Sequence, residues 1–215
     1  MRGRTGNTLP IRGTSHRAFD IVAAAAAVVL TSPAWVVIAV AIELDSGGPV
    51  FHRATRTGRY GQPFQLYKFR SMAVNADGPG VTAATDRRIT RVGRVLRKSK
   101  LDELPQLLNV IRGDMALVGP RPEDPRYVAL YTPEERRVLD VRPGLVSSAV
   151  IAYRHEEALL ASASDVEETY TNKVMREKLA MDIRYLERAS FRSDLGVLLG
   201  AIASIPRRRP PVAPL

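Results

Sequence analysis

Cysteine is absent from the 215 residues of this chain, which excludes disulfides, thiolate nucleophiles and Cys-ligated zinc. Histidine is scarce as well. His16, His52 and His155 lie far apart and form neither an HExxH nor an HxxxH pair, which disfavours a histidine zinc site. The hydrophobic content of 45% and the charged content of 25% are those of a folded domain rather than of a disordered chain.

Acidic residues are sparse in the first half of the chain. Residues 1–100 carry 16 basic and 5 acidic side chains, a net charge of +11. Residues 101–215 carry 16 basic and 17 acidic side chains, a net charge of −1. The basic half therefore indicates an anionic partner, which is nucleic acid, a phosphorylated small molecule or an anionic membrane surface.

One long segment, residues 21–42, has no charged side chain. As a continuous helix it would be about 33 Å long, enough to cross a hydrocarbon core of about 30 Å. Three interpretations compete: a signal peptide, a spanning helix kinked at Pro33, and a hairpin that enters the membrane, breaks at Ser32-Pro33 and returns. The signal peptide is the least favoured, because the apolar run continues well past the small residues near Ser32.

Basic residues flank this apolar segment on both sides. They are Arg2, Arg4, Arg12 and Arg17 before it, and Arg53, Arg56, Arg59, Lys68 and Arg70 after it. Basic flanks favour the cytoplasmic side, and a hairpin places both flanks there, whereas a spanning helix places one outside. Ser32-Pro33 also divides the segment into two pieces of about 16 Å each. We therefore expect a re-entrant hairpin, with the kinked spanning helix as the alternative.

The rest of the sequence predicts an α+β fold that is rich in helix. A small β element is expected from strand patterns at residues 50–52 and 64–69, separated by a turn at 57–61. Residues 75–84 have the composition of a loop. Helical patterns cover residues 86–100, 101–112, 166–190 and 195–205, and the last of these is too short to span a membrane.

The first of these helical patterns carries an extreme charge. Its basic residues are Arg87, Arg88, Arg91, Arg94, Arg97, Lys98 and Lys100, with no acid between them. A solvated face of this kind would repel itself, so we expect an amphipathic interfacial helix that faces a membrane surface or phosphate groups.

Two adjacent acids, Asp102 and Glu103, follow this basic stretch at the start of the next helix. Acids are common at that position because they complement the helix dipole. Surrounded by so many cations, they are also typical of a site that handles phosphate and a metal. One carboxylate can then act as a nucleophile while its neighbour holds Mg²⁺.

Several motifs, taken in order, resemble those of the bacterial sugar transferases, the small monotopic phosphoglycosyl transferases. The motifs are Gly48-Pro-Val-Phe51, Lys68-Phe-Arg-Ser-Met72, Ser99-Lys-Leu-Asp-Glu-Leu-Pro-Gln-Leu107, Asn109-Val-Ile-Arg-Gly-Asp-Met115, Val118-Gly-Pro-Arg-Pro122 and Arg142-Pro-Gly144. The resemblance covers about residues 16–205. It implies an enzyme that transfers a phosphosugar from a nucleotide-diphosphate sugar to polyprenyl (undecaprenyl) phosphate, as the first step of a surface-polysaccharide or glycoconjugate pathway.

The same resemblance implies roles for individual residues. Asp102 would attack the β-phosphate and form a phosphosugar-aspartate intermediate, and Glu103, together with Asp102, would coordinate Mg²⁺. The substrate-binding residues would be Lys68, Arg70, Arg97, Arg112, Pro120 and Arg121, with Tyr153 and Arg154 as further contacts to the nucleotide. Residues 145–160 depart from the pattern of many members, so the identity of the sugar is left open.

The resemblance also implies a layout of the chain. A basic N-terminal segment (1–20) would precede a re-entrant membrane helix (21–44) broken at Ser32-Pro33. A cytoplasmic catalytic domain (45–205) and a basic, proline-rich tail (206–215) would follow. The protein would be monotopic, on the cytoplasmic face of the bacterial inner membrane and in contact with anionic lipids.

Two other functions fit the charge alone. The first is a membrane-tethered protein that binds nucleic acid through residues 87–100. That stretch has no aromatic side chain on which a base could stack, and this function leaves Asp102 and Glu103 without a role, so we expect no nucleic acid. The second is a scaffold that binds anionic lipids without catalysis.

Overall fold

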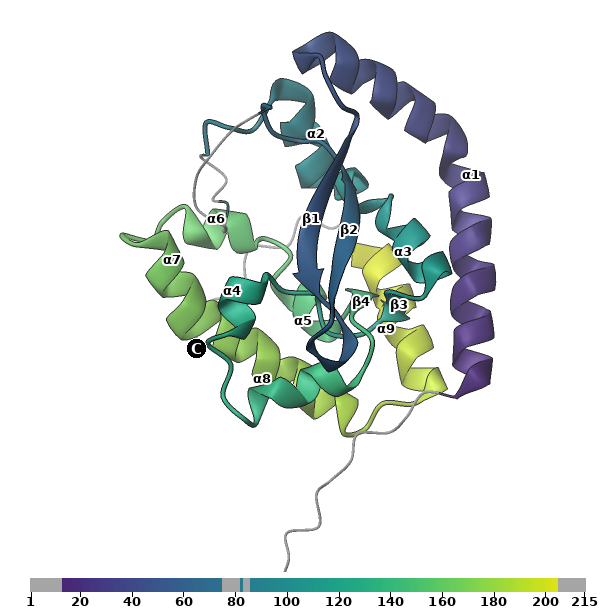
Figure 1. The fold of residues 1–215 in the computed structure, drawn as a ribbon, viewed down its shortest axis with the longest axis vertical. Helices are drawn as coiled ribbons and strands as arrows, with labels where there is room; N and C mark the ends of the chain where they lie inside the picture. The colour runs from purple at the N-terminus through teal and green to yellow at the C-terminus, as the bar shows by residue number, and fades with distance from the viewer. Residues whose placement is uncertain (1–12, 75–81, 83–85, 205–215) are drawn as a thin grey trace, which may run out of the picture.

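The computed structural model describes residues 13–74, 82 and 86–204. Helix α1 (Thr14–Ser46) runs along one side of the molecule and contacts α2 (Arg91–Ser99), α3 (Gln106–Arg112) and strand β3 (Ala116–Val118) (Figure 1). Helix α9 (Phe191–Ser204) begins beside the start of α1, where the Phe191 ring packs edge-on against Phe19. The opposite side holds α4 (Pro125–Val128), α6 (Glu156–Leu160), α7 (Val166–Thr169) and α8 (Met175–Leu186), with α5 (Ser148–Ala152) against α8.

Helix α1 corrects the expectation of a hairpin broken at Ser32-Pro33. It is one continuous helix of 33 residues that bows along its length (Figure 1). Pro33 has no N–H to donate to the carbonyl of Val29, four residues earlier. The Ser32 hydroxyl donates to that same carbonyl at 2.8 Å, so the missing bond is replaced and the helix continues.

The β structure of the described residues consists of two separate two-stranded sheets. Strands β1 (Phe51–Thr57) and β2 (Pro63–Phe69) form the expected hairpin, antiparallel with Phe51 opposite Phe69. Strands β3 (Ala116–Val118) and β4 (Gly144–Val146) pair in parallel, which the sequence did not predict. The fold class is confirmed as helix-rich α+β with a small β element.

Three hydrophobic clusters hold these elements together, and α1 belongs to two of them. One cluster joins Ala24 of α1 to Leu107 and Val110 of α3 and to the strands. Another joins Ile38 and Ile42 of α1 to residues of β2 and α2. The third lies beneath α8 and includes Tyr127 and Tyr170. The long apolar helix is therefore part of the fold along both of its halves.

Several predicted helices have other limits in the structure. Helix α2 begins at Arg91 rather than at residue 86, because the Thr90 hydroxyl caps it by accepting the Gly93 N–H at 2.9 Å. The pattern at 101–112 divides into a 3₁₀ turn, η2 (Leu101–Glu103), and α3, which ends at Gly113 as expected. The pattern at 166–190 is helical to Leu186, with a π-helical turn, η4 (Tyr170–Val174), between α7 and α8.

Some expectations fall outside the described residues. These include most of the loop at 75–84, the first part of the basic N-terminal segment and the tail at 206–215. Residues 195–204 of the pattern at 195–205 lie within α9, where Phe191, Leu195, Leu199 and Ile202 are exposed, and residue 205 falls outside the described residues. Their spacing gives α9 one apolar exposed face, while its role at a membrane interface stays a prediction.

Candidate active site

The two acids lie in the short turn η2, between the basic helix α2 and the buried helix α3. Lys100 ends α2 in the left-handed conformation, with φ of 60°, and its carbonyl accepts the Glu103 N–H at 3.2 Å. This reversal turns Asp102 into the protein, where its side chain is among the few buried charged groups, at 5% exposure. The local backbone therefore buries the acid pair directly beside the cations of α2.

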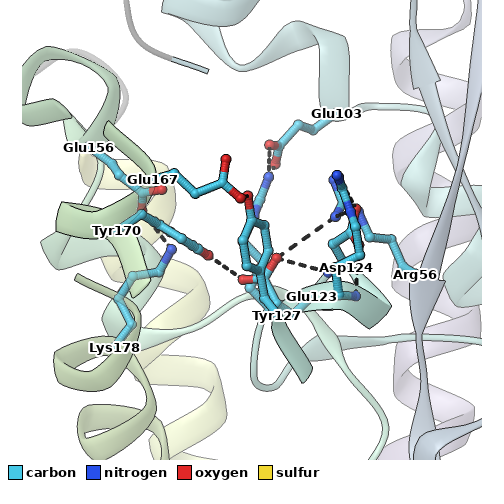
Figure 2. Close-up of polar contacts among 11 residues, drawn as sticks. Arg56, Glu103, Glu123, Asp124, Tyr127, Glu156, Glu167, Tyr170 and Lys178 are labelled. Atoms are coloured by element: carbon cyan, nitrogen blue, oxygen red, sulfur yellow. Dashed lines mark hydrogen bonds and ion pairs between the residues drawn. The ribbon is translucent and has the colours of Figure 1, made fainter. Parts of the chain in front are cut away.

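Glu103 is held by Arg121 in a two-armed ion pair. Arg121 Nη2 lies 2.6 Å from Glu103 Oε1, and Nη1 lies 3.3 Å from Oε2 (Figure 2). Burial alone would raise the pKa of Glu103, but the charges of Arg121 and Lys68 outweigh it and the pKa is lowered. Glu103 is therefore a fixed anion with both oxygens engaged.

Asp102 has a different environment from its neighbour. Its Oδ1 atom is buried and has no hydrogen-bond partner among the described residues. Burial and the charge of Glu103 raise the pKa of Asp102, while Lys68, Lys100 and Arg97 oppose that rise. Two adjacent carboxylates with pKa values pushed in opposite directions are suited to different chemical tasks.

Lys68 reaches the acid pair from strand β2. Burial lowers the pKa of its ammonium to about 8, helped by the charges of Arg121 and Arg56, while Glu103 and Asp102 act in the other direction. The ammonium thus lies within the fields of both acids and of two arginines, as a phosphate-binding group would.

The loop that carries Arg121 is fixed by the unexpected parallel strands. Beyond β3, the Gly119 N–H donates to the carbonyl of Val146 at 2.9 Å, and the Gly144 N–H donates to the carbonyl of Pro120 at 2.8 Å. The two backbones approach so closely that a Cβ atom on Gly144 would lie 2.0 Å from the Gly119 nitrogen. Pro120 is buried in this contact, and Arg121 extends from it toward Glu103.

The predicted substrate-binding residues do not all gather at the acid pair. Lys68, Arg97 and Arg121 do, and Arg97 is paired with Glu157 of α6 at 2.6 Å. Arg154 lies in the turn between α5 and α6.

The other predicted residues have partners elsewhere. Arg70 is buried and donates to the Ser46 hydroxyl at 2.9 Å and to the Gly47 carbonyl, at the end of α1. The Arg112 guanidinium lies 5.4 Å from the centre of the Tyr67 ring and donates to its hydroxyl. The Tyr153 hydroxyl donates to Glu177 of α8.

The sequence analysis missed a polar network that includes Glu123, Glu156, Tyr170 and Lys178 (Figure 2). The Tyr170 hydroxyl donates to Glu123, which also lies 3.8 Å from Arg56. Glu156 binds Lys178 at 2.6 Å, and both Glu156 and Glu123 raise the pKa of Arg121 after the larger effect of Glu103. One signal was available, because Glu123 and Asp124 directly follow Pro120-Arg121-Pro122.

The described residues contain no group of three His, Cys, Asp or Glu side chains placed to hold a metal ion. A closed metal cage is therefore absent from that part of the chain. Mg²⁺ bound to phosphates needs only one or two protein carboxylates, with phosphate and water oxygens completing its shell. The buried, unpartnered Oδ1 of Asp102 beside Glu103 fits that open type of site.

Comparison with known proteins adds to this geometry. The family model described as bacterial sugar transferase matches residues 11–208. The chain belongs to this family. The sugar transferase is 42% identical over 209 residues to a UDP-glucose:undecaprenyl-phosphate glucose-1-phosphate transferase of Caulobacter vibrioides, covering 94% of this chain and 74% of that protein.

Two further relatives agree with this assignment. The sugar transferase is 35% identical to the exopolysaccharide production protein ExoY of Rhizobium meliloti, covering 94% of this chain and 89% of that protein. It is 37% identical to a UDP-N-acetylgalactosamine-undecaprenyl-phosphate N-acetylgalactosaminephosphotransferase of Aeromonas hydrophila, covering 91% of this chain but 44% of that protein. The predicted family and enzyme class, a phosphoglycosyl transferase, are confirmed.

Proposed function

We propose that this sugar transferase moves a phosphosugar from a nucleotide-diphosphate sugar to undecaprenyl phosphate through a covalent intermediate on Asp102. The names of its relatives support the overall transfer. The observation that carries the choice of nucleophile is the contrast within the acid pair. Glu103 has both oxygens bound to Arg121, whereas Asp102 has a buried oxygen without a partner among the described residues.

The reaction takes place in two displacements at one phosphorus atom. In the first, an Asp102 oxygen bonds to the β-phosphorus of the donor, the bond from that phosphorus to the bridging oxygen breaks, and nucleoside monophosphate leaves. In the second, a phosphate oxygen of the lipid bonds to the same phosphorus, and the Asp102 carboxylate is released. The product is a polyprenyl diphosphate sugar. A soluble donor and a lipid acceptor thus use the same site in turn.

The cations allow one anion to approach another. Lys68, Arg97 and Arg121 neutralise the phosphate oxygens, and Glu103 keeps the Arg121 fork in place from the protein side. Asp102 and Glu103 would also hold Mg²⁺, which supplies further charge neutralisation at the phosphates when it is bound.

We also propose that the enzyme lies on the cytoplasmic face of the inner membrane as a monotopic protein. The outward face of α1 is apolar and exposed, with Leu30 at 79% and Leu44 at 83% exposure. The cations Arg91, Arg94 and Lys98 on the exposed face of α2 suit anionic lipid headgroups. Both halves of α1 pack against one domain, which favours a helix that enters one leaflet over one that crosses the bilayer.

The decisive test uses the purified protein in nanodiscs with Mg²⁺, undecaprenyl phosphate, and UDP-glucose or UDP-N-acetylgalactosamine. We expect release of UMP with one of these donors. With donor alone, we expect a phosphosugar adduct on Asp102, detected by mass spectrometry of the quenched protein. Asp102→Asn should abolish both signals, and Asp140→Asn, at an exposed aspartate, should retain them. Release of UMP without any adduct would instead show direct attack by the lipid phosphate.

A further inference from the structure

The two ends of α1 make polar contacts with the two helices on either side of the acid pair. Near the end of α1, Asp45 Oδ2 accepts the Val92 N–H of the first turn of α2 at 2.9 Å. Near its start, Arg17 donates to the last turn of α3, from Nη1 to the Val110 carbonyl at 2.7 Å and from Nη2 to the Ile111 carbonyl at 3.0 Å. The segment that contains Asp102 is therefore held by α1 at both of its ends.

The chemistry of these contacts matches what helix ends need. The N–H groups of a first helical turn and the carbonyls of a last turn have no partners within their own helix. Asp45 supplies an acceptor to an N–H group in the first turn of α2, and Arg17 supplies donors to two carbonyls in the last turn of α3. The signs are also favourable, since an anion lies at the positive end of α2 and a cation at the negative end of α3.

Apolar packing continues the attachment between these two polar contacts. Ala24 of α1 is fully buried in the cluster that contains Leu107 of α3, and Ile42 is nearly so in the cluster that contains Leu96 of α2. Helix α1 thus packs along one side of the segment from α2 to α3 (Figure 1).

The placement of α2 and α3 determines where Asp102 lies. Only residues 100–105 join the two helices, so η2 cannot move independently of them. Helix α2 is also pressed onto the chain that follows β2, because a Cβ atom on Gly93 would lie 2.0 Å from the Ser71 carbonyl oxygen. A change in the position or tilt of α1 would shift Asp102 relative to Lys68 and Arg121. Misplacement of a reacting group by about 1 Å can lower the rate by a factor of about 100.

We propose that Arg17 and Asp45 are positioning residues. Through them, the position and tilt of the membrane helix α1 determine the position of the nucleophile Asp102. Neither touches the substrate. They clamp α2 and α3 from behind and so keep Asp102 in line with the phosphorus that Lys68 and Arg121 bind. The inference rests on the proposed function and adds to it a coupling between membrane insertion and catalysis.

The test compares Asp45→Ala, Asp45→Asn and Arg17→Ala in nanodiscs. We expect each alanine variant to lower kcat, and the rate of adduct formation, by about tenfold with little change in KM for the donor, because the phosphate-binding cations stay in place. Asp45→Asn should recover most of the lost kcat, since its amide oxygen still accepts the Val92 N–H. Arg17→Lys should fall between wild type and Arg17→Ala, because an ammonium reaches one carbonyl at a time.

Two matched variants control for charge and stability. Glu43→Ala removes an exposed acid near the same end of α1, and Arg184→Ala removes an exposed arginine of α8. Both should keep the wild-type kcat. Thermal unfolding is followed for every variant, and the rates are referred to folded protein, so a simple loss of stability would leave kcat unchanged.

Three results would overturn the inference. They are an unchanged kcat in both alanine variants, a loss confined to KM, and an Asp45→Asn variant no better than Asp45→Ala. If an alanine variant does not fold, Arg17→Lys decides, because it should have a lower kcat than the wild type and an unchanged kcat would overturn the inference. A wild-type protein that releases no UMP with any donor would instead contradict the proposed function itself, so the two failures are distinguishable.

Discussion

Arg121 holds Glu103 with both arms of its guanidinium, 2.6 and 3.3 Å from the two carboxylate oxygens. In the part of the chain that the structure describes, the neighbouring Asp102 is then the carboxylate of the pair whose buried oxygen has no hydrogen-bond partner. Because a guanidinium has five N–H donors, Arg121 can hold Glu103 and still contact a phosphate oxygen. The ion pair is therefore compatible with substrate binding and orients the arginine for it.

We predict that the proposed phosphate binding needs the two-armed guanidinium of Arg121 and not only its positive charge. Arg121→Lys keeps the cation but cannot make two parallel bonds to Glu103, so we expect kcat/KM to fall by about tenfold or more. UMP release at varied donor concentration measures this. Arg126→Lys, at an exposed arginine paired with Asp124, serves as the control and should be close to wild type. Wild-type kinetics for Arg121→Lys would contradict this role.

We expect Glu157 to compete with the donor for Arg97. The two side chains are 2.6 Å apart, so the proposed binding of a donor phosphate by Arg97 would require the guanidinium to exchange this carboxylate for a phosphate oxygen. Glu157→Gln removes the competing charge, and we expect a lower KM for the donor and tighter binding of UMP by calorimetry. Glu168→Gln, at an exposed glutamate of α7, should change neither. Weaker UMP binding in Glu157→Gln would mean that Glu157 helps to hold the ligand.

Ser32 keeps α1 continuous across Pro33. In Ser32→Ala the Val29 carbonyl loses its donor, and lipid offers no replacement, so we expect the protein in nanodiscs to lose about 1–3 kcal/mol of stability. Thermal unfolding measures this, and Ser32→Thr should restore it. As a control, Ser204→Ala removes a hydroxyl that donates to the Ala201 carbonyl of α9. Because α9 has no internal proline, the loss of stability should be smaller.

Both ends of α1 should lie on the same side of the membrane. They contact a single domain through Arg17 and Asp45, which a helix crossing the bilayer could not do. Cysteines introduced by Gly13→Cys and Tyr60→Cys should both resist an impermeant thiol reagent on intact spheroplasts, and both should react after lysis. Labelling of only one of them from outside would show a spanning helix.

Stability should depend on pH through Asp182. Burial raises the pKa of this carboxyl to about 6, although Ser147 and Lys178 oppose the rise. The folded state then binds more protons than the unfolded state between about pH 4 and 6, so stability falls as the pH rises through that window. Asp182→Asn stays neutral and should be more stable at pH 7, by up to about 3 kcal/mol for two pKa units, with no gain at pH 4. Melting temperatures across this range measure the effect, and an equal change at both pH values would contradict it.

Local patterns in the sequence were enough to predict part of the fold. The β1–β2 hairpin, the helix stop at Gly113 and the position of the acid pair depend on neighbouring residues, and the structure agrees with them. The parallel pairing of β3 with β4 was missed because each strand has three residues and its partner lies more than 20 residues away. Such short strands show neither alternation nor a turn signal.

The sequence also could not predict the direction in which a charged side chain points. Lys68 and Arg70 are two residues apart and equally basic in the sequence, yet Lys68 faces the acid pair and Arg70 binds the end of α1. The break expected at Pro33 failed for a similar reason. The sequence shows that Ser32 precedes Pro33, but only the structure shows that the Ser32 hydroxyl donates to the Val29 carbonyl.

The clamp formed by α1 also sets an order of events during synthesis. Val92 is made 47 residues after Asp45, and Val110 is made 93 residues after Arg17. At about 5–20 residues per second, Asp45 is synthesised about 2–9 seconds before Val92, and Arg17 about 5–19 seconds before Val110. Throughout that interval its inner face has no protein to pack against, so lipid or a chaperone must cover it. The apolar helix is therefore complete before the segment that carries Asp102 has been synthesised.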